Sequence, residues 1–186
     1  MKPIDGEKTL LIDVDACVRC FACEVACREE HGLGVETRSR WMRVMTVGPR
    51  KLGEKLHLDF VPVPCLHCPD PACAKACPKG AISRGEDGLV LVDEERCSGC
   101  RLCVSACPFG RMCFNEVTSS AGHCDLCRDR VGAGLGPACV QHCIAGALQW
   151  ISTDKLPDLL SGAHTASWGR VRYVSNLWRL NSVDQG

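Results

Sequence analysis

The sequence CSGCRLCVSACP at residues 97–108 decides the fold of this 186-residue chain. Three cysteines stand two residues apart, a fourth follows after three more residues, and a proline comes directly behind it. Thiolates at this spacing are typical of a short loop that wraps an iron–sulfur cluster. The stretch therefore predicts that a [4Fe–4S] site organises the fold around it.

All but one of the 17 cysteines fall into four such motifs. The first motif has the same gaps without the proline, the second widens one gap to four residues, and the fourth widens one gap to eleven. A similar tail containing glycine follows the last cysteine of three motifs, which indicates duplication of one unit. The motifs are Cys17, Cys20, Cys23 and Cys27; Cys65, Cys68, Cys73 and Cys77; Cys97, Cys100, Cys103 and Cys107; and Cys124, Cys127, Cys139 and Cys143.

The spacing has a physical reason. A loop of this kind turns its backbone amides toward the negative sulfurs of a cluster and supplies three thiolates. In paired motifs the last cysteine of each run binds the neighbouring cluster, so four motifs predict two pairs of clusters. Sixteen thiolates for four clusters leave no iron open to a substrate, because a catalytic metal needs a vacant position. We therefore expect electron relay and no catalysis.

Zinc and disulfides are the two structural alternatives for so many cysteines. Paired Cys-x2-Cys units also describe tetrahedral zinc sites, and the fourth motif alone has a spacing that fits one. Zinc explains poorly the runs of three cysteines at two-residue gaps. A disulfide framework is disfavoured further, because 17 is an odd number and the neighbouring cysteines cannot all pair without strain.

The formal charge is balanced, with 22 basic against 22 acidic side chains, which argues against nucleic acid as a main partner. Four oxidised clusters would add roughly eight negative charges. Basic side chains near the motifs are expected to offset part of that charge, although a solvated surface position is the alternative for each. These are Arg19, Arg28, Lys75, Lys79, Arg101, Arg111, Arg128 and Arg130.

The chain offers no predicted membrane span or export signal. No window reaches 18 continuous apolar residues, and the most apolar candidate, residues 134–151, is interrupted by Gln141, His142 and Gln149. The first residues contain neither a basic region followed by an apolar stretch nor paired arginines.

Short strands and helices are predicted around the motifs. Apolar runs predict strands over residues 10–14, 58–63, 89–93 and 147–152. The turn-rich residues 84–88 predict a hairpin that joins residues 80–83 to residues 89–92. Short helices are expected to carry the last cysteine of the motifs, over residues 21–30, 71–77 and 102–107.

Two further segments carry no motif. The long connection between the first two motifs contains residues 41–47, whose alternation predicts a strand before a Gly-Pro turn. The tail over residues 154–186 combines Trp168, Tyr173 and Trp178 with arginines. Such a composition is typical of a docking surface, and the equal alternative is that the tail covers the core of its own domain.

The phrases PCLHC at residues 64–68, CDLCRDR at 124–130 and PACV at 137–140 resemble a known family. They are similar to those of the four-cluster ferredoxin-like electron-transfer subunits of molybdenum and tungsten bis-pterin oxidoreductases. The resemblance covers residues 8–152. It departs from the family in lacking a proline after Cys27 and Cys143, and in the absence of the long carboxy-terminal membrane anchor of some members.

The resemblance implies an α+β fold of two interleaved bacterial ferredoxin-like halves with short strands, short helices and long loops. Residues 1–30 with 118–153 would form the first half, and residues 55–117 the second. Residues 31–54 would be a connecting insertion, and residues 154–186 a carboxy-terminal docking tail.

The resemblance also implies the ligands of four [4Fe–4S] clusters. We call the four sets site 1 to site 4. Site 1 is Cys17, Cys20, Cys23 and Cys143; site 2 is Cys65, Cys68, Cys73 and Cys107; site 3 is Cys97, Cys100, Cys103 and Cys77; site 4 is Cys124, Cys127, Cys139 and Cys27.

The function implied is relay between a molybdenum or tungsten bis-pterin catalytic subunit and another redox partner, which could be a flavin or iron–sulfur subunit. The length and the ending CIAGALQW at residues 143–150 look closest to small subunits that serve tungsten aldehyde oxidoreductase-like enzymes. A free-standing polyferredoxin and a zinc-stapled interaction module are the alternatives. A cytoplasmic location is expected, with export on a signal-bearing partner as the alternative.

Four residues near the motifs have two interpretations each. Cys113 lies outside all motifs, and we expect a buried, inert thiol there rather than a redox group. The histidines beside cluster ligands are expected either to pack in the structure or to donate a hydrogen bond to a cluster sulfur. They are His67, His123 and His142.

Overall fold

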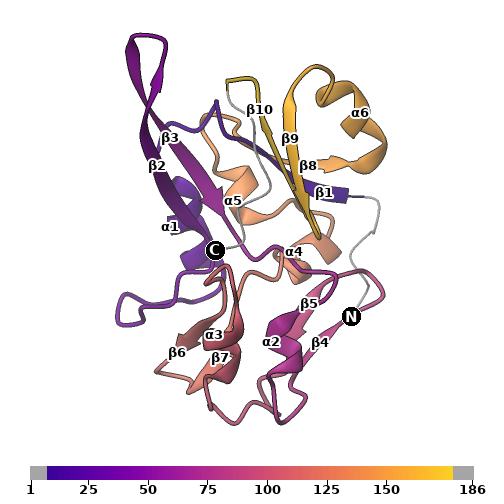
Figure 1. The fold of residues 1–186 in the computed structure, drawn as a ribbon. Coiled ribbons are helices and arrows are strands. Elements are labelled where there is room, and N and C mark those ends of the chain that lie inside the picture. Colours follow the sequence, from indigo (N-terminus) through magenta and orange to yellow (C-terminus); the bar gives the residue numbers. More distant parts are fainter. Residues whose placement is uncertain (1–7, 178–186) are drawn as a thin grey trace.

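The computed structural model of the protein describes residues 8–177, and its helices are short and its strands are spread over several small sheets. Figure 1 shows one body that contains a four-stranded sheet and a second body below it, with a long hairpin extending from the first. The mixture of strands and short helices confirms the predicted α+β class. Within the described residues, none of the helices has the length and apolar character required to cross a membrane.

The four-stranded sheet has the order β8-β1-β10-β9. Strand β1 pairs antiparallel with β8 and parallel with β10, so segments from both ends of the chain lie side by side. Leu10 and Ile12 of β1 are fully buried, because a central strand covered on its sides needs apolar side chains. The strands are β1 (Lys8–Asp13), β8 (Leu148–Ser152), β9 (His164–Trp168) and β10 (Val171–Ser175).

Helices cover this body, and α1 packs against α5. The other helical elements of the first body are about one turn long; two lie within the fourth motif and two follow β8. The helices here are α1 (Ala22–Glu30), α4 (Arg128–Gly132), α5 (Ala138–Gln141), the 3-10 turn η1 (Thr153–Lys155) and α6 (Leu156–Leu159).

The second body consists of two small hairpins and two packed helices. The predicted hairpin between the second and third motifs is present, with Ile82 opposite Val92. A further hairpin, β6–β7, crosses the predicted boundary between the two ferredoxin-like halves, which falls between residues 117 and 118. The elements are α2 (Ala72–Lys75), β4 (Ile82–Arg84), β5 (Val90–Val92), α3 (Leu102–Ala106), β6 (Cys113–Asn115) and β7 (Ser120–Gly122).

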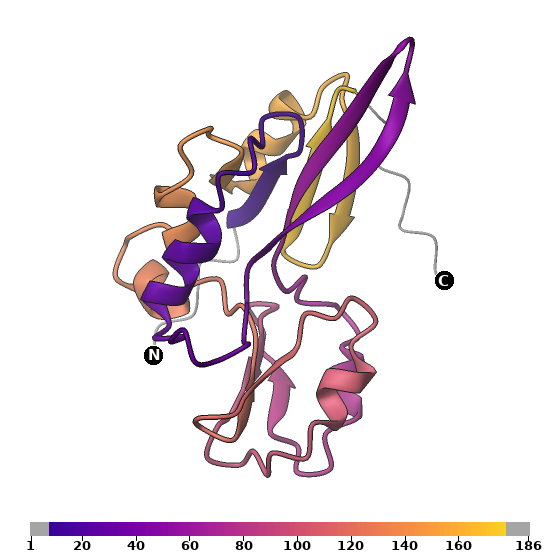
Figure 2. The same ribbon diagram turned by 90° about the vertical axis from the view of Figure 1, so that its left-hand side faces the viewer.

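The long hairpin consists of β2 (Arg43–Leu52) and β3 (Lys55–Val63), and Figure 2 shows its tip projecting beyond both bodies. The predicted strand over residues 41–47 is therefore the start of β2. The strand continues through the Gly48-Pro49 pair, where the pairing register shifts. Proline lacks the N–H that a ladder needs, so it is tolerated here only at an irregularity of the pairing.

The helices are shorter than predicted. Cys27 lies inside α1, but Cys77, Cys107 and Cys143 follow α2, α3 and α5 without being part of them. Proline disfavours a helical conformation in the residue before it, and Cys107, which precedes Pro108, has φ −75° and ψ 110°. The last cysteine of these motifs thus sits on a turn.

The tail is part of the fold over residues 164–175. Strands β9 and β10 complete the four-stranded sheet, and Tyr173 is buried and donates a hydrogen bond to the Pro62 carbonyl at 3.2 Å. Trp168 packs beside Tyr173 in the same apolar cluster. This favours the alternative in which the tail covers its own core. Trp178 lies outside the described residues.

Gly169 joins β9 to β10 against the loop of the second motif, and its φ of +49° is left-handed. A Cβ atom there would overlap the carbonyl oxygens of Leu66 and His67. We expect Gly169→Ala to destabilise the protein by about 3 kcal/mol, measured as a lower thermal unfolding midpoint. Gly162→Ala is the control, because Gly162 has φ +79° and no heavy atom within 4 Å of the added carbon. Equal midpoints for the two variants would contradict the close approach.

Candidate metal centres

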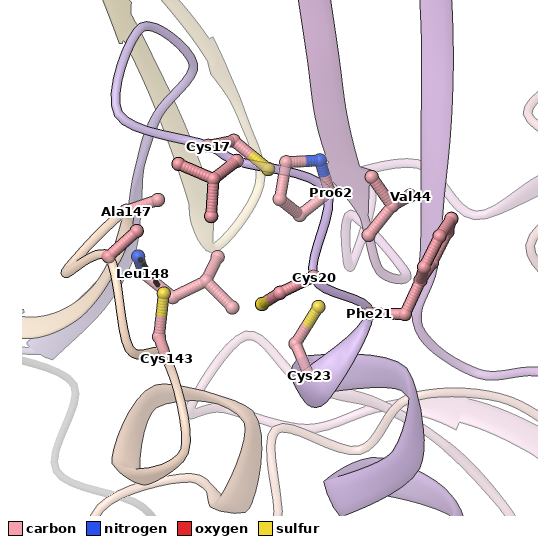
Figure 3. Close-up of a pocket in the computed structure, with 11 residues that line it drawn as sticks. Cys17, Cys20, Phe21, Cys23, Val44, Pro62, Cys143, Ala147 and Leu148 are labelled. Atoms are coloured by element: carbon pink, nitrogen blue, oxygen red, sulfur yellow. Dashed lines mark hydrogen bonds between the residues drawn. The ribbon is translucent and has the colours of Figure 1, made fainter.

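Site 1 lies in a pocket lined by the first motif, the long hairpin and the turn before β8, with about 310 Å³ of space including its opening to solvent. Figure 3 shows the side chains of Cys17, Cys20 and Cys23 on one side of this space and Cys143 on the other. Val44 and Pro62 of the long hairpin close the cavity. Three thiols of the first motif are thus brought together with the last thiol of the fourth.

Sites 2 and 3 lie in cavities of similar size in the second body. Cys65, Cys68, Cys73 and Cys107 line a cavity of about 380 Å³. Cys97, Cys100, Cys103 and Cys77 line another of about 310 Å³. In each case the last thiol comes from the partner motif.

The four thiols of site 4 are all buried. Burial raises the pKa of Cys124 and Cys139 well above the ordinary thiol value, and the negative charge of Cys27 adds to both shifts. Burial likewise raises the pKa of Cys27 to about 12, with Cys127 as the next cause. These effects indicate that Cys27 of the first motif lies near Cys124, Cys127 and Cys139 of the fourth.

The loop of each motif contains a left-handed residue directly before its second cysteine. The φ angles are 57° at Arg19, 50° at His67, 70° at Gly99 and 58° at Leu126. Only one of these residues is glycine, so three side chains adopt a conformation that costs about 1–3 kcal/mol each. The turn directs the N–H groups of Arg19, His67 and Leu126 at the first thiol of their motifs. Burial raises the pKa of these thiols, and the N–H groups oppose part of that rise.

The recurring glycine three residues after the last cysteine of three motifs forms a turn next to that cysteine. Gly80, Gly110 and Gly146 have φ between 56° and 66°, and each donates its N–H to the carbonyl of the preceding last cysteine at 3.1 Å. The chain then turns so that the N–H of a residue just beyond the glycine points at that cysteine's sulfur. These bonds run from Ala81 to Cys77 at 3.3 Å, from Arg111 to Cys107 at 3.3 Å, and from Leu148 to Cys143 at 3.4 Å.

The donor chemistry fits iron–sulfur clusters. Burial raises the pKa of Cys23 and Cys65 to about 12, so four thiolates cannot gather in one cavity without a cation. Metal ions supply that charge and displace the thiol protons. At Cys77 burial raises the pKa, but backbone N–H groups of Lys79, Gly80, Ala81 and Ile82 outweigh it, and the net pKa is lowered. The loops thus stabilise anionic sulfur.

The four sites form a row. Cys23 of site 1 contributes to the raised pKa values of Cys27 and Cys139 in site 4, and Cys73 of site 2 does the same for Cys103 of site 3. Sites 4 and 2 meet where the rings of His67 and His123 lie 5.7 Å apart. Proximity therefore gives the order 1-4-2-3.

The three histidines singled out from the sequence bind backbone groups. His67 is fully buried and its Nδ1 accepts the N–H of Val90 at 3.0 Å. Nδ1 of His123 pairs with the Cys124 carbonyl at 2.7 Å, and Nδ1 of His142 with the Ala138 carbonyl at 2.9 Å. Their contacts favour the packing alternative. Burial lowers the pKa of His67 to about 3, so its ring is neutral.

Two other residues complete the surroundings of the sites. Arg111 is buried, donates to the Phe109 carbonyl at 2.8 Å and lines the cavity of site 2, where its charge offsets that of the thiolates. Cys113 lines none of the cavities described above, is half-buried, and donates to the Arg40 carbonyl at 3.4 Å.

One histidine near a site was missed by sequence reasoning. Nε2 of His31 lies 3.5 Å from the sulfur of Cys127. Its only signal in the sequence is its place four residues after Cys27, because the partner thiol is 96 residues away along the chain.

Comparison with known proteins identifies the family. Residues 56–152 match a model described as a 4Fe-4S dicluster domain. The chain is 38 % identical over 150 residues to the B subunit of the anaerobic dimethyl sulfoxide reductase of Escherichia coli (strain K12), covering 78 % of this chain and 73 % of that one. It is 39 % identical over 157 residues to the thiosulfate reductase electron transfer subunit PhsB of Salmonella typhi, covering 83 % and 81 %.

The chain is also 35 % identical over 168 residues to the iron-sulfur subunit of the nitrate-inducible formate dehydrogenase of Escherichia coli (strain K12), covering 83 % of this chain and 57 % of that one. It therefore belongs to the 4Fe-4S dicluster family of iron–sulfur electron-transfer subunits. This membership confirms the predicted resemblance, the [4Fe–4S] cofactors and the role of a non-catalytic subunit.

Serine substitutions distinguish ligands from the odd cysteine. We expect Cys139→Ser to lose about a quarter of the iron, because site 4 then lacks one of four thiolates. Cys113→Ser should keep all of its iron, since Cys113 bonds only a carbonyl among the described residues. Iron analysis of anaerobically purified protein checks both. Equal iron in the two variants would contradict the division into ligands and non-ligand.

Proposed function

We propose that this chain passes electrons one at a time along four [4Fe–4S] clusters held by sites 1 to 4 in the order 1-4-2-3. Each transfer oxidises one cluster and reduces its neighbour, and no substrate bond is broken. With all sixteen motif thiolates used as ligands, the chain leaves the reaction itself to a partner subunit.

The observation that carries this proposal is the pattern of burial along the row. Cys20 of site 1 and Cys100 of site 3 are exposed, whereas every thiol of site 4 is buried and those of site 2 are half-buried. A relay needs contact with partners at its ends and exclusion of water between them. The row has both properties.

We further propose that the motifs are interleaved. The first and fourth motifs would share sites 1 and 4 in a half formed by residues 1–30 and 118–153. The second and third motifs would share sites 2 and 3 in a half formed by residues 55–117, to which β7 adds its pairing with β6 across residues 117 and 118. The supporting observations are the thiols that line each cavity and the pairing of β1 with β8.

The partner we propose is a molybdenum or tungsten bis-pterin catalytic subunit. The relatives named as the B subunit of a reductase and as an electron transfer subunit support assembly with a catalytic chain. A second redox subunit would serve the other end of the row. The cytoplasmic location and its periplasmic alternative stay predictions, which fractionation of the source cells checks.

Anaerobic purification tests the cofactor content. We expect a brown protein with about 16 iron atoms and an equal amount of sulfide per chain, and four centres that reduce without turnover of any substrate. Fewer than about 12 iron atoms per chain would contradict four clusters. A colourless protein with stoichiometric zinc would support the zinc-stapled module instead.

The partner is tested separately on the native protein. Gel filtration of an anaerobic extract should place the chain in a complex with a chain that carries molybdenum or tungsten. Elution as a single chain, with full iron content, would contradict the partner and support a free-standing polyferredoxin carrier.

A further inference from the structure

His31 directly follows α1 and faces two acceptors that belong to the loop of site 4. Its Nε2 atom is 3.5 Å from the sulfur of Cys127 and 3.5 Å from Oδ1 of Asp125. A thiolate ligand and a carboxylate can only accept hydrogen bonds, so Nε2 must carry the hydrogen. The imidazole therefore presents an N–H donor to a ligand sulfur.

A ring contact, a backbone hydrogen bond and burial fix the position of His31. Its ring centre lies 4.4 Å from that of Trp41. Its backbone N–H bonds the carbonyl of Cys27 at 3.2 Å, and Cys27 is itself a thiol of site 4. Only 12 % of the side chain is exposed. A donor fixed in this way keeps its geometry when the charge of the site changes.

Asp125 acts on the same thiols with the opposite sign. Its Oδ1 accepts the N–H of Cys127 at 2.8 Å, which fixes the carboxylate in the loop. Its negative charge contributes to raising the pKa of Cys27, Cys124 and Cys127, behind burial as the largest cause. A neighbouring negative charge disfavours any further negative charge at the site.

We propose that His31 is a positioning residue that raises the reduction potential of the cluster in site 4 by donating a hydrogen bond to the sulfur of Cys127. The inference rests on the proposed function, because it requires a cluster at site 4. Reduction adds one electron and no proton to this cluster. Donors to ligand sulfurs stabilise the added charge, which makes reduction easier.

The position of site 4 gives this bond a role in the relay. Site 4 comes next to site 1 in the proposed order, and all of its thiols are buried. Burial in apolar surroundings alone would disfavour the reduced, more negative state of its cluster. The His31 donor opposes that penalty. An electron that enters at site 1 thus finds a neighbour able to accept it.

The test is a potentiometric titration of the purified chain at one fixed pH, followed by electron paramagnetic resonance. The signal of site 4 is the one that Cys139→Ser removes. His31→Phe keeps an aromatic ring against Trp41 but has no donor. We expect it to lower the equilibrium constant for reducing site 4 about tenfold, which is about 59 mV for one electron.

A second variant separates tuning from simple damage to the loop. Asp125→Asn keeps the oxygen that accepts the Cys127 N–H and removes the charge, so the potential of site 4 should rise. His31→Gln retains an N–H donor and should fall between His31→Phe and the unaltered protein. His142→Phe is the matched control, because His142 stands beside Cys143 yet bonds a carbonyl, and no signal should shift.

Three outcomes would overturn the proposal. One is an unchanged site 4 potential in His31→Phe. Another is a shift in the same direction for His31→Phe and Asp125→Asn, which would indicate loop damage. The third is stoichiometric zinc in the unaltered protein that is lost in His31→Phe, since His31, Asp125 and Cys127 could together hold a metal ion. A failure of the proposed function is distinct from these, because the unaltered protein would then lack its full iron content.

Discussion

The structure depends on one constraint, which is that anionic sulfur must be stabilised inside a small protein. Backbone N–H groups are the main donors available, and a chain can aim several of them at one sulfur only by turning sharply. Arg19, His67 and Leu126 adopt left-handed conformations for this reason, although each has a Cβ atom. The cost of about 1–3 kcal/mol for each such residue is offset by metal ligation, which contributes to folding in sites of this kind.

The same constraint explains why the chain folds with so few aromatic side chains. The larger apolar cluster includes Cys23, Cys27, Cys124 and Cys139 together with leucines of β1 and the motif loops. A second cluster contains Cys103, Ile82 and Met112. The thiols therefore take the place of apolar side chains in both cores. Loss of a cluster should disturb packing as well as electron transfer.

The charged side chains beside the buried sites differ in sign from one site to the next. Arg111 brings a buried cation to site 2, whereas site 4 has a carboxylate in its own loop and an imidazole donor beside it. The ends of the row contain the exposed thiols Cys20 and Cys100. Neighbouring charges therefore affect the reduction potentials of sites 2 and 4 most strongly, because solvent screens charges less at buried positions.

The sequence by itself determined the chemistry, because ligand type and spacing are local properties of the chain. The motifs, the hairpin after Cys77 and the helix after Phe21 could all be predicted from neighbouring residues. The glycine of the recurring tail was visible too, although its task of aiming an N–H at the sulfur was not.

Only the tertiary structure decided which distant residues meet. The parallel pairing of β1 with β10 brings Leu10 beside Val171, and no local pattern specifies such a partner. The contact of His31 with Cys127 and the approach of Gly169 to the loop of Cys65 and Cys68 are of the same kind. These contacts join residues that are 96 to 161 positions apart in the chain, and they form because the packing around the four sites brings the segments together.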